Sequence, residues 1–174
     1  RGVDRMREWA DDAKPVWTVI ETTRINNPDK KATPHQVRAE VWMSLVHGSL
    51  GIVYFAHEWE PKFVEAGLLA DAEMSAAVAG INRQILALAP VLNSPTVADG
   101  VEVSSSAPEF PVDALAKQYR GDTYIFAVGM RLGETQATFQ IAGLEGETRA
   151  EIIDEGREII VSDGRFTDDF AAYD

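Results

Sequence analysis

Two short apolar segments, separated by a stretch with helical spacing, constrain the fold of this chain most. Residues 16–21 are predicted to form a strand with Trp17, Val19 and Glu21 on one side, and Ile52–Phe55 a second strand. Both sides of the first strand are mostly apolar, as in a parallel sheet that helices cover. Neighbouring parallel strands end at one edge of their sheet, so we expect Glu21 to lie beside the residues that follow Phe55.

The segment between the two strands has the pattern of a well-capped helix. Thr33 is a candidate N-cap, Pro34 suits the first helical position, and Gln36 completes a capping box. The predicted helix runs to about His47, where Gly48 can end it in a left-handed conformation. A strand, a helix and a second strand form the repeating unit of (β/α) barrels, which carry reactive residues at the carboxyl ends of their strands.

A second, longer helix is predicted from Asp71 to Leu88, after a short apolar segment at Phe63–Leu69. Its apolar residues recur at spacings of three and four, which indicates one face buried in a core. Pro90 is expected to bend or end this helix. An earlier segment, residues 3–13, is expected to be the end of another helix.

After Pro95 the apolar period changes from that of helices to two, which predicts antiparallel strands joined by glycine-containing turns. The predicted strands are Val101–Ser105, Leu115–Tyr119, Thr123–Met130, Ala137–Ile141, Arg149–Ile153 and Glu158–Val161, and Phe166–Phe170 resembles the lead-in to one more. We therefore predict an α/β plus all-β chain. Residues 1–95 would be the C-terminal part of a TIM-type (β/α) barrel, and residues 96–174 a small antiparallel β-sandwich.

Composition excludes several classes of function. The net charge is −12, of which residues 96–174 carry −10, and no Lys/Arg cluster could neutralise the phosphates of a nucleic acid. No uninterrupted apolar run approaches the roughly 18–20 residues of a membrane span, so no membrane partner is expected. The chain has no cysteine, its three histidines lack metal-ligand spacing, and no phosphate-binding loop is present. We expect neither a metal nor a cofactor.

The residues best suited to catalysis or ligand binding lie at or just after the ends of the two predicted strands. Glu21 ends the first strand, where a carboxylate can act as nucleophile or acid/base, or can simply be a surface residue that caps the next loop. His57, Glu58 and Trp59 follow the second strand. An indole ring stacks on sugar faces, and imidazole and carboxylate groups bond hydroxyls. The alternative for Trp59 is packing against the long helix.

A serine-dependent reaction is the rival enzyme class. His47-Gly48-Ser49 places a histidine near a serine, but no Gly-x-Ser-x-Gly elbow surrounds any serine of the chain. His47 is expected to end a helix and to interact with its dipole. An ester hydrolase that uses a serine with His47 or His57 stays open as the alternative.

The stretch Lys14–Trp59 resembles strand 7, helix 7 and strand 8 of a retaining glycoside hydrolase barrel of clan A, in particular the β-galactosidase-like (family 42-like) group. The segments that carry the resemblance are Pro15–Thr22, Arg38–Ser49 and Gly51–Phe55. The resemblance implies that Glu21 is the nucleophile, that His57, Glu58 and Trp59 line the sugar site, and that the substrate is a carbohydrate.

The chain departs from this family at one functional position. The family's acid/base carboxylate ends strand 4, whereas this sequence begins near the family's helix 6, so we expect it to be the C-terminal fragment of a glycosidase. A catalytically inactive fragment with an accessory or sugar-binding β domain is the remaining alternative. Strands taken from a barrel have open edges and an unpartnered apolar face, so we also expect a homo-oligomer.

Overall fold

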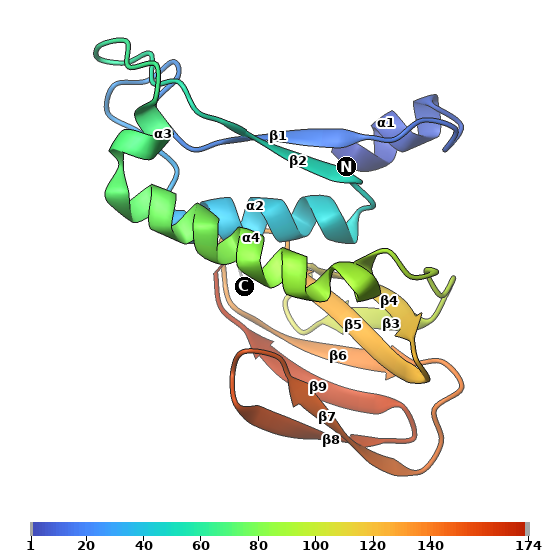
Figure 1. Ribbon diagram of the computed structural model, residues 1–174. Coiled ribbons are helices and arrows are strands. Elements are labelled where there is room, and N and C mark those ends of the chain that lie inside the picture. Colours follow the sequence, from blue (N-terminus) through green and yellow to red (C-terminus); the bar gives the residue numbers. More distant parts are fainter. Residues whose placement is uncertain (1, 173–174) are drawn as a thin grey trace. The chain divides into compact units, whose positions relative to one another are not determined.

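The structure is a computed structural model that describes residues 2–172, and it divides into two compact units, Arg1–Pro90 and Val91–Asp174. The first unit contains β1 (Trp17–Glu21), α2 (Pro34–Val46) and β2 (Gly51–Phe55). The two strands pair in parallel, in a register that places Glu21 opposite Phe55. The predicted strand–helix–strand order and the parallel pairing are thus confirmed (Figure 1).

The capping of α2 agrees with the sequence pattern. The Thr33 side chain accepts a hydrogen bond from the Gln36 backbone, and the Gln36 side chain accepts one from the Thr33 backbone. At the other end His47 is the C-cap, and Gly48 takes a left-handed φ of 88°. The helix therefore begins and ends where its local sequence directs it.

The remaining helices of the first unit are α1 (Gly2–Trp9), α3 (Gly67–Ala70) and α4 (Ala72–Leu92). α1 ends four residues before the predicted limit at residue 13, because Asp11 and Asp12 adopt left-handed φ values of 50° and 51°, which aspartate tolerates. α4 contains Pro90 and continues to Leu92. Pro90 has no N–H to donate to the Leu86 carbonyl oxygen, and the helix ends two residues after it.

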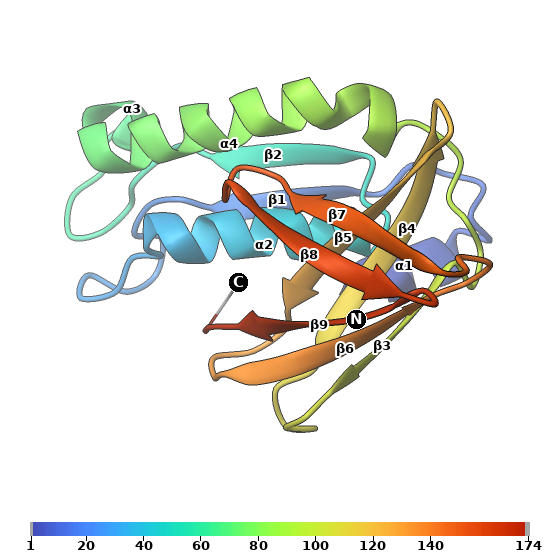
Figure 2. The ribbon, with the colours of Figure 1, turned by 90° about the horizontal axis from the view of Figure 1, so that it is seen from below.

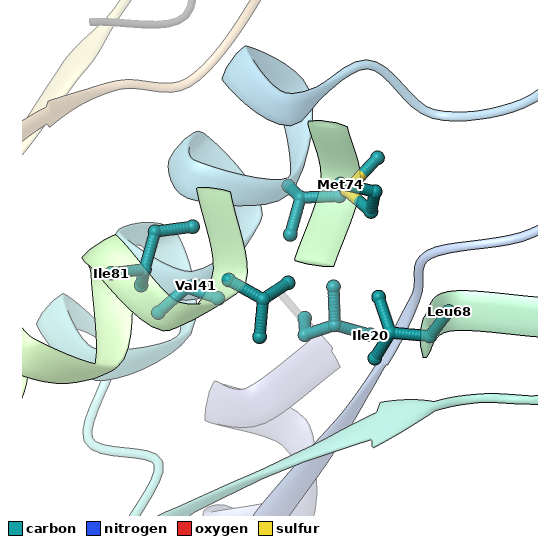
Figure 3. Packing of buried hydrophobic residues seen from close by; sticks show 7 residues of the cluster. Ile20, Val41, Leu68, Met74 and Ile81 are labelled. Carbon is teal, nitrogen blue, oxygen red and sulfur yellow. The ribbon is translucent and has the colours of Figure 1, made fainter. Parts of the chain in front are cut away.

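The core of the first unit lies between the strand pair and its helices. Ile20 of β1, Val41 of α2 and Leu68 of α3 pack with Met74 and Ile81 of α4 (Figure 3). These α4 residues belong to the stripe predicted from the sequence, which is thereby confirmed as core.

Among the described helices, α4 is the one long and apolar enough to cross a membrane by length and composition, with a mean hydropathy of 1.3 in its most apolar window. Core helices of soluble proteins pass the same test, so this finding is weak evidence for a membrane span.

The other face of the strand pair is open to solvent. Trp17 is 65% exposed and Val19 60%, and Val53 beside Val19 is also exposed. The Trp17 indole lies over Gly51, where an added Cβ would be 2.7 Å from the ring atom Cδ2. The helices α2, α3 and α4 pack on the opposite face of the strand pair, where Ile20 lies, so Trp17 is not part of the described core (Figure 1).

The second unit is built from antiparallel strands. They are β3 (Val101–Ser105), β4 (Val112–Tyr119), β5 (Asp122–Gly129), β6 (Thr135–Ile141), β7 (Glu147–Ile152), β8 (Arg157–Ser162) and β9 (Arg165–Phe170). β4 and β5 pair as a hairpin, and the others form a sheet in the order β3-β6-β9-β8-β7 (Figure 2). The segment at 166–170, expected only to lead into a strand, is itself part of β9 and pairs with β6.

The core of this unit joins the hairpin to the sheet. Val112 of β4 packs with Ala137 and Phe139 of β6, and Phe166 of β9 stacks on Phe139 at a centroid distance of 4.6 Å. The C-terminal half is therefore mainly β, with two antiparallel layers that share an apolar interior.

No closed barrel is present in residues 2–172, where the parallel strands are β1 and β2. The structure thus confirms mixed helices and strands, with the antiparallel sheets in the C-terminal part. The assignment of residues 1–95 to a partial barrel and of 96–174 to a sandwich domain stays a prediction.

Candidate functional site

The candidate site lies where β1 and β2 end. Glu21 is the last residue of β1 and is exposed, on the same face of the strand as Trp17 and Val19. Its partner in the register, Phe55, is the last residue of β2. The structure therefore brings the carboxylate and the polar-aromatic segment after Phe55 to one edge of the sheet, as the sequence predicts.

Two buried threonines extend the pairing beyond the strand ends. The Thr22 hydroxyl donates to the Phe55 carbonyl oxygen at 2.7 Å, and the Thr23 hydroxyl donates to the His57 carbonyl oxygen at 2.6 Å. Threonine side chains here replace the backbone hydrogen bonds that stop with β1. The loop after β2 is thus held in place directly next to Glu21.

Arg24 fixes the next part of the same loop. Its carbonyl oxygen accepts hydrogen bonds from the backbone N–H of Trp59 at 2.8 Å and of Glu60 at 3.3 Å. Its guanidinium donates to the half-buried Glu58 carboxylate at 3.3 Å. Glu58, predicted to contact substrate, therefore has an ion-pair partner within the protein, and Arg24 is a residue of the site that sequence reasoning missed.

His57 is held between aromatic neighbours. Its Nδ1 makes a hydrogen bond with the Glu65 carbonyl oxygen. Its ring contacts Phe55 edge-on, with centroids 5.8 Å apart, and Phe63 at 6.0 Å. The imidazole orientation is therefore set by one polar and two aromatic contacts.

Trp59 and Phe63 form an exposed pair of rings at the outer end of this cluster. Their centroids are 5.1 Å apart and their planes are inclined by 54°. Trp59 is 50% exposed, so half of its surface remains open to solvent. The sequence indicated Phe63 only as part of an apolar segment. Its proximity to Trp59 arises from the antiparallel pairing of Glu58 with Val64, which the sequence pattern does not indicate.

A second carboxylate, Glu40 of α2, interacts electrostatically with Glu21. Partial desolvation of the Glu40 carboxyl, and then the negative charge of Glu21, raise the pKa of Glu40 above its usual range. A raised pKa favours the protonated form of a carboxyl group. No local sequence pattern indicates that Glu21 and Glu40 interact, because the two residues are 19 positions apart and a loop lies between them.

The side chains of Ser49 and His47, the candidates for a serine-dependent reaction, make hydrogen bonds within the protein. Ser49 is buried, and its oxygen accepts a hydrogen bond from the Thr18 hydroxyl at 3.0 Å, while its proton is shared between the carbonyl oxygens of Gly51 and Val16 at 3.0 and 3.3 Å. His47, the C-cap of α2, makes a hydrogen bond to Asp4 at 2.8 Å. These contacts tie strand starts and a helix end together, at the pole opposite Glu21.

In the part of the chain that the structure describes, no group of three or more His, Asp or Glu side chains is placed to hold a metal ion.

Comparison with known proteins gives a likeness in fold. No family model and no curated protein matches the sequence. A crystal structure of a variant of AmyP in complex with maltotriose superimposes with a TM-score of 0.61 and 9% identity. The match covers 98% of this chain and 42% of the AmyP chain, so this chain spans less than half the length of that neighbour. The chain is thus similar in fold to part of AmyP.

Proposed function

We propose that this chain is the C-terminal part of a retaining glycoside hydrolase of the family 42-like group, with Glu21 as its nucleophile. The observation that carries the proposal is the placement of an exposed carboxylate beside a loop with aromatic and polar side chains, at the carboxyl edge of two parallel strands. This edge is where (β/α) barrels place their active sites. The fold likeness to AmyP, whose structure contains maltotriose, supports a carbohydrate substrate.

In the proposed reaction the Glu21 carboxylate attacks the anomeric carbon of the sugar, and the bond to the leaving oxygen breaks. An acid protonates that oxygen, and water later releases the sugar from its ester with Glu21. Retaining hydrolysis requires two carboxyl groups about 5–5.5 Å apart. We propose that a barrel strand outside these 174 residues supplies the acid, while His57, Glu58 and Trp59 contact the sugar.

The test is aryl glycoside hydrolysis by the complete polypeptide that carries this sequence. We expect Glu21→Gln to lower kcat by about 10³-fold or more, because an amide cannot form the ester intermediate. Azide added to Glu21→Ala should restore turnover by occupying the place of the lost carboxylate. Glu40→Gln, which removes the neighbouring carboxylate, is the matched control and should keep most of the activity.

Unchanged glycoside hydrolysis in Glu21→Gln would refute the assignment of the nucleophile. The ester hydrolase alternative has less support, because the Ser49 hydroxyl is buried and hydrogen-bonded. The ester hydrolase alternative would be supported if the chain hydrolysed short aryl esters and a folded Ser49→Ala variant did not.

An accessory role without catalysis is the second candidate. The exposed ring pair of Trp59 and Phe63 favours it, since such a surface can bind a sugar whether or not a second carboxylate is present. Sugar binding by a chain that hydrolyses no glycoside, even in its complete polypeptide, would support this candidate over the first.

A further inference from the structure

We infer that Trp59 and Phe63 together form a two-ring platform that binds the apolar face of a sugar ring, and that this binding does not require the Glu21 carboxylate. The inference rests on the proposed function for its ligand class, a neutral oligosaccharide. It adds Phe63 to the site and separates sugar binding from bond cleavage.

The exposure of the two rings is the first observation. Trp59 is 50% exposed and Phe63 is 51% exposed, although each contacts the other and Phe63 also contacts His57. Aromatic residues of this size are usually buried further than this. Two neighbouring rings that keep half of their surface in water offer apolar area to a ligand.

The rigidity of the backbone beneath the rings is the second observation. Glu58 and Val64 exchange two backbone hydrogen bonds, at 3.0 and 2.8 Å, which close the loop that carries both rings. The Trp59 N–H is also bound to the Arg24 carbonyl oxygen. A platform held in this way loses little conformational freedom when a ligand binds, so more of the contact energy appears as affinity.

A continuous series of ring contacts connects the platform to the candidate catalytic edge. Phe55, the partner of Glu21 in the register, contacts His57; His57 contacts Phe63; and Phe63 contacts Trp59. A sugar bound on the platform would therefore extend outward from the strand end that carries Glu21.

The charges around the platform favour a neutral ligand. The segment that carries the rings contains three carboxylates, Glu58, Glu60 and Glu65, and one ammonium group, Lys62, so its net charge is negative, and the Arg24 guanidinium is engaged by Glu58. Carboxylates accept hydrogen bonds from sugar hydroxyls, whereas they repel phosphate and carboxylate ligands. The surface thus combines apolar rings with acceptors, which is the chemistry of a carbohydrate site.

The experiment measures binding of maltotriose, cellotriose and lactose to the 174-residue chain by calorimetry. We expect at least one of these sugars to bind, Trp59→Ala and Phe63→Ala each to lower its affinity by about tenfold, and Glu21→Gln to leave it unchanged. Trp59→Phe and Phe63→Tyr, which keep a ring, should retain most of the affinity. Trp9→Ala on α1, where the indole is 75% exposed, is the matched control and should bind like the wild type.

Three outcomes would overturn the inference: no binding of any of the three sugars up to about 10 mM, unchanged affinity in both alanine variants, or an equal loss in Trp9→Ala. Ring variants that change self-association but not sugar affinity would point instead to a protein-contact surface, which also overturns it. Circular dichroism of each variant separates loss of binding from loss of folding, and Phe63→Leu keeps the apolar volume if Phe63→Ala unfolds.

The inference and the proposed function fail separately. Loss of hydrolysis in Glu21→Gln with normal sugar binding in the ring variants would keep the nucleophile and remove the platform. Loss of binding in the ring variants with unchanged hydrolysis in Glu21→Gln would keep the platform and refute Glu21 as the nucleophile.

Discussion

At the scale of single residues, Asp71 shows how one carboxylate stabilises two elements. One oxygen accepts a hydrogen bond from the Met74 backbone at 3.0 Å, which caps the first turn of α4, and the other pairs with the Lys31 ammonium. The bond from Lys31, and then the one from the Met74 backbone, lower the pKa of Asp71 below its ordinary value of 3.8. The ionised form is therefore the one that the folded state favours.

We expect Asp71→Ala to reduce the free energy of unfolding by roughly 1–2 kcal/mol at neutral pH, from a lost N-cap and a partly exposed ion pair. Because the folded-state pKa is lowered, the ionised carboxylate contributes its stability above pH 3.8 and loses it as the pH falls through the folded pKa. The difference between wild type and variant should therefore shrink in acid, as urea unfolding at several pH values would measure.

Asp71→Asn is the control, since asparagine caps a helix well but carries no charge. It should retain most of the stability and lose the pH dependence. A wild-type advantage over Asp71→Ala that persists unchanged at pH 2 would contradict the assignment of this dependence to Asp71.

At the scale of elements, close backbone approach joins α3 to the loop of the candidate site. A Cβ on Gly67 would lie 2.7 Å from the Glu58 Cβ and 2.9 Å from the Glu58 nitrogen, closer than such atoms normally approach. The Leu68 N–H, one residue further, donates to the Ala56 carbonyl oxygen at 2.9 Å. The start of α3 can therefore support the Glu58 segment only with glycine at position 67.

Gly67→Ala is expected to destabilise the chain by about 1–3 kcal/mol, because the backbone atoms that meet the new methyl group cannot move aside easily. Gly80→Ala in α4 is the opposite case. The nearest atom to its new Cβ is an Arg83 side-chain nitrogen at 3.8 Å, so alanine should stabilise the helix by about 0.5–1 kcal/mol. Thermal unfolding of both variants measures these changes in stability. Equal changes in the two variants would contradict the close approach of Gly67 to Glu58.

At the scale of the whole molecule, the first unit has an apolar face and two open strand edges. Trp17, Val19 and Val53 are exposed together, and in the described residues β1 and β2 pair only with each other. Exposed edges and apolar faces favour association. We therefore propose, as the sequence led us to expect, that the isolated chain forms a homo-oligomer through this face.

Sedimentation at micromolar concentration should show an oligomer for the wild type and a monomer for Val19→Lys/Val53→Lys. The reason is that burying each valine is worth roughly 1.5–3 kcal/mol, which a charged side chain would forfeit. Leu86→Lys changes an exposed apolar residue of α4 and should leave assembly intact. A folded wild-type monomer would contradict the proposal.

Several elements have local causes and can be predicted from the residues that form them. The capping box at Thr33 and Gln36, the buried stripe of α4 and the period of two after Pro95 each depend on residues a few positions apart, so the chain encodes them directly. It also led to the edge shared by Glu21 and His57, since a helical crossover between two strands makes them parallel.

Which distant side chains meet depends on the packing of the elements and cannot be predicted from local patterns. Arg24 and Glu58 are 34 residues apart, and their contact depends on how two loops close over the strand ends. The ring pair of Trp59 and Phe63, the influence of Glu21 on Glu40, and the exposure of Trp17 likewise follow from packing. A sequence pattern states which face of an element is apolar, but whether that face is covered depends on the elements packed against it, and no local pattern carries that information.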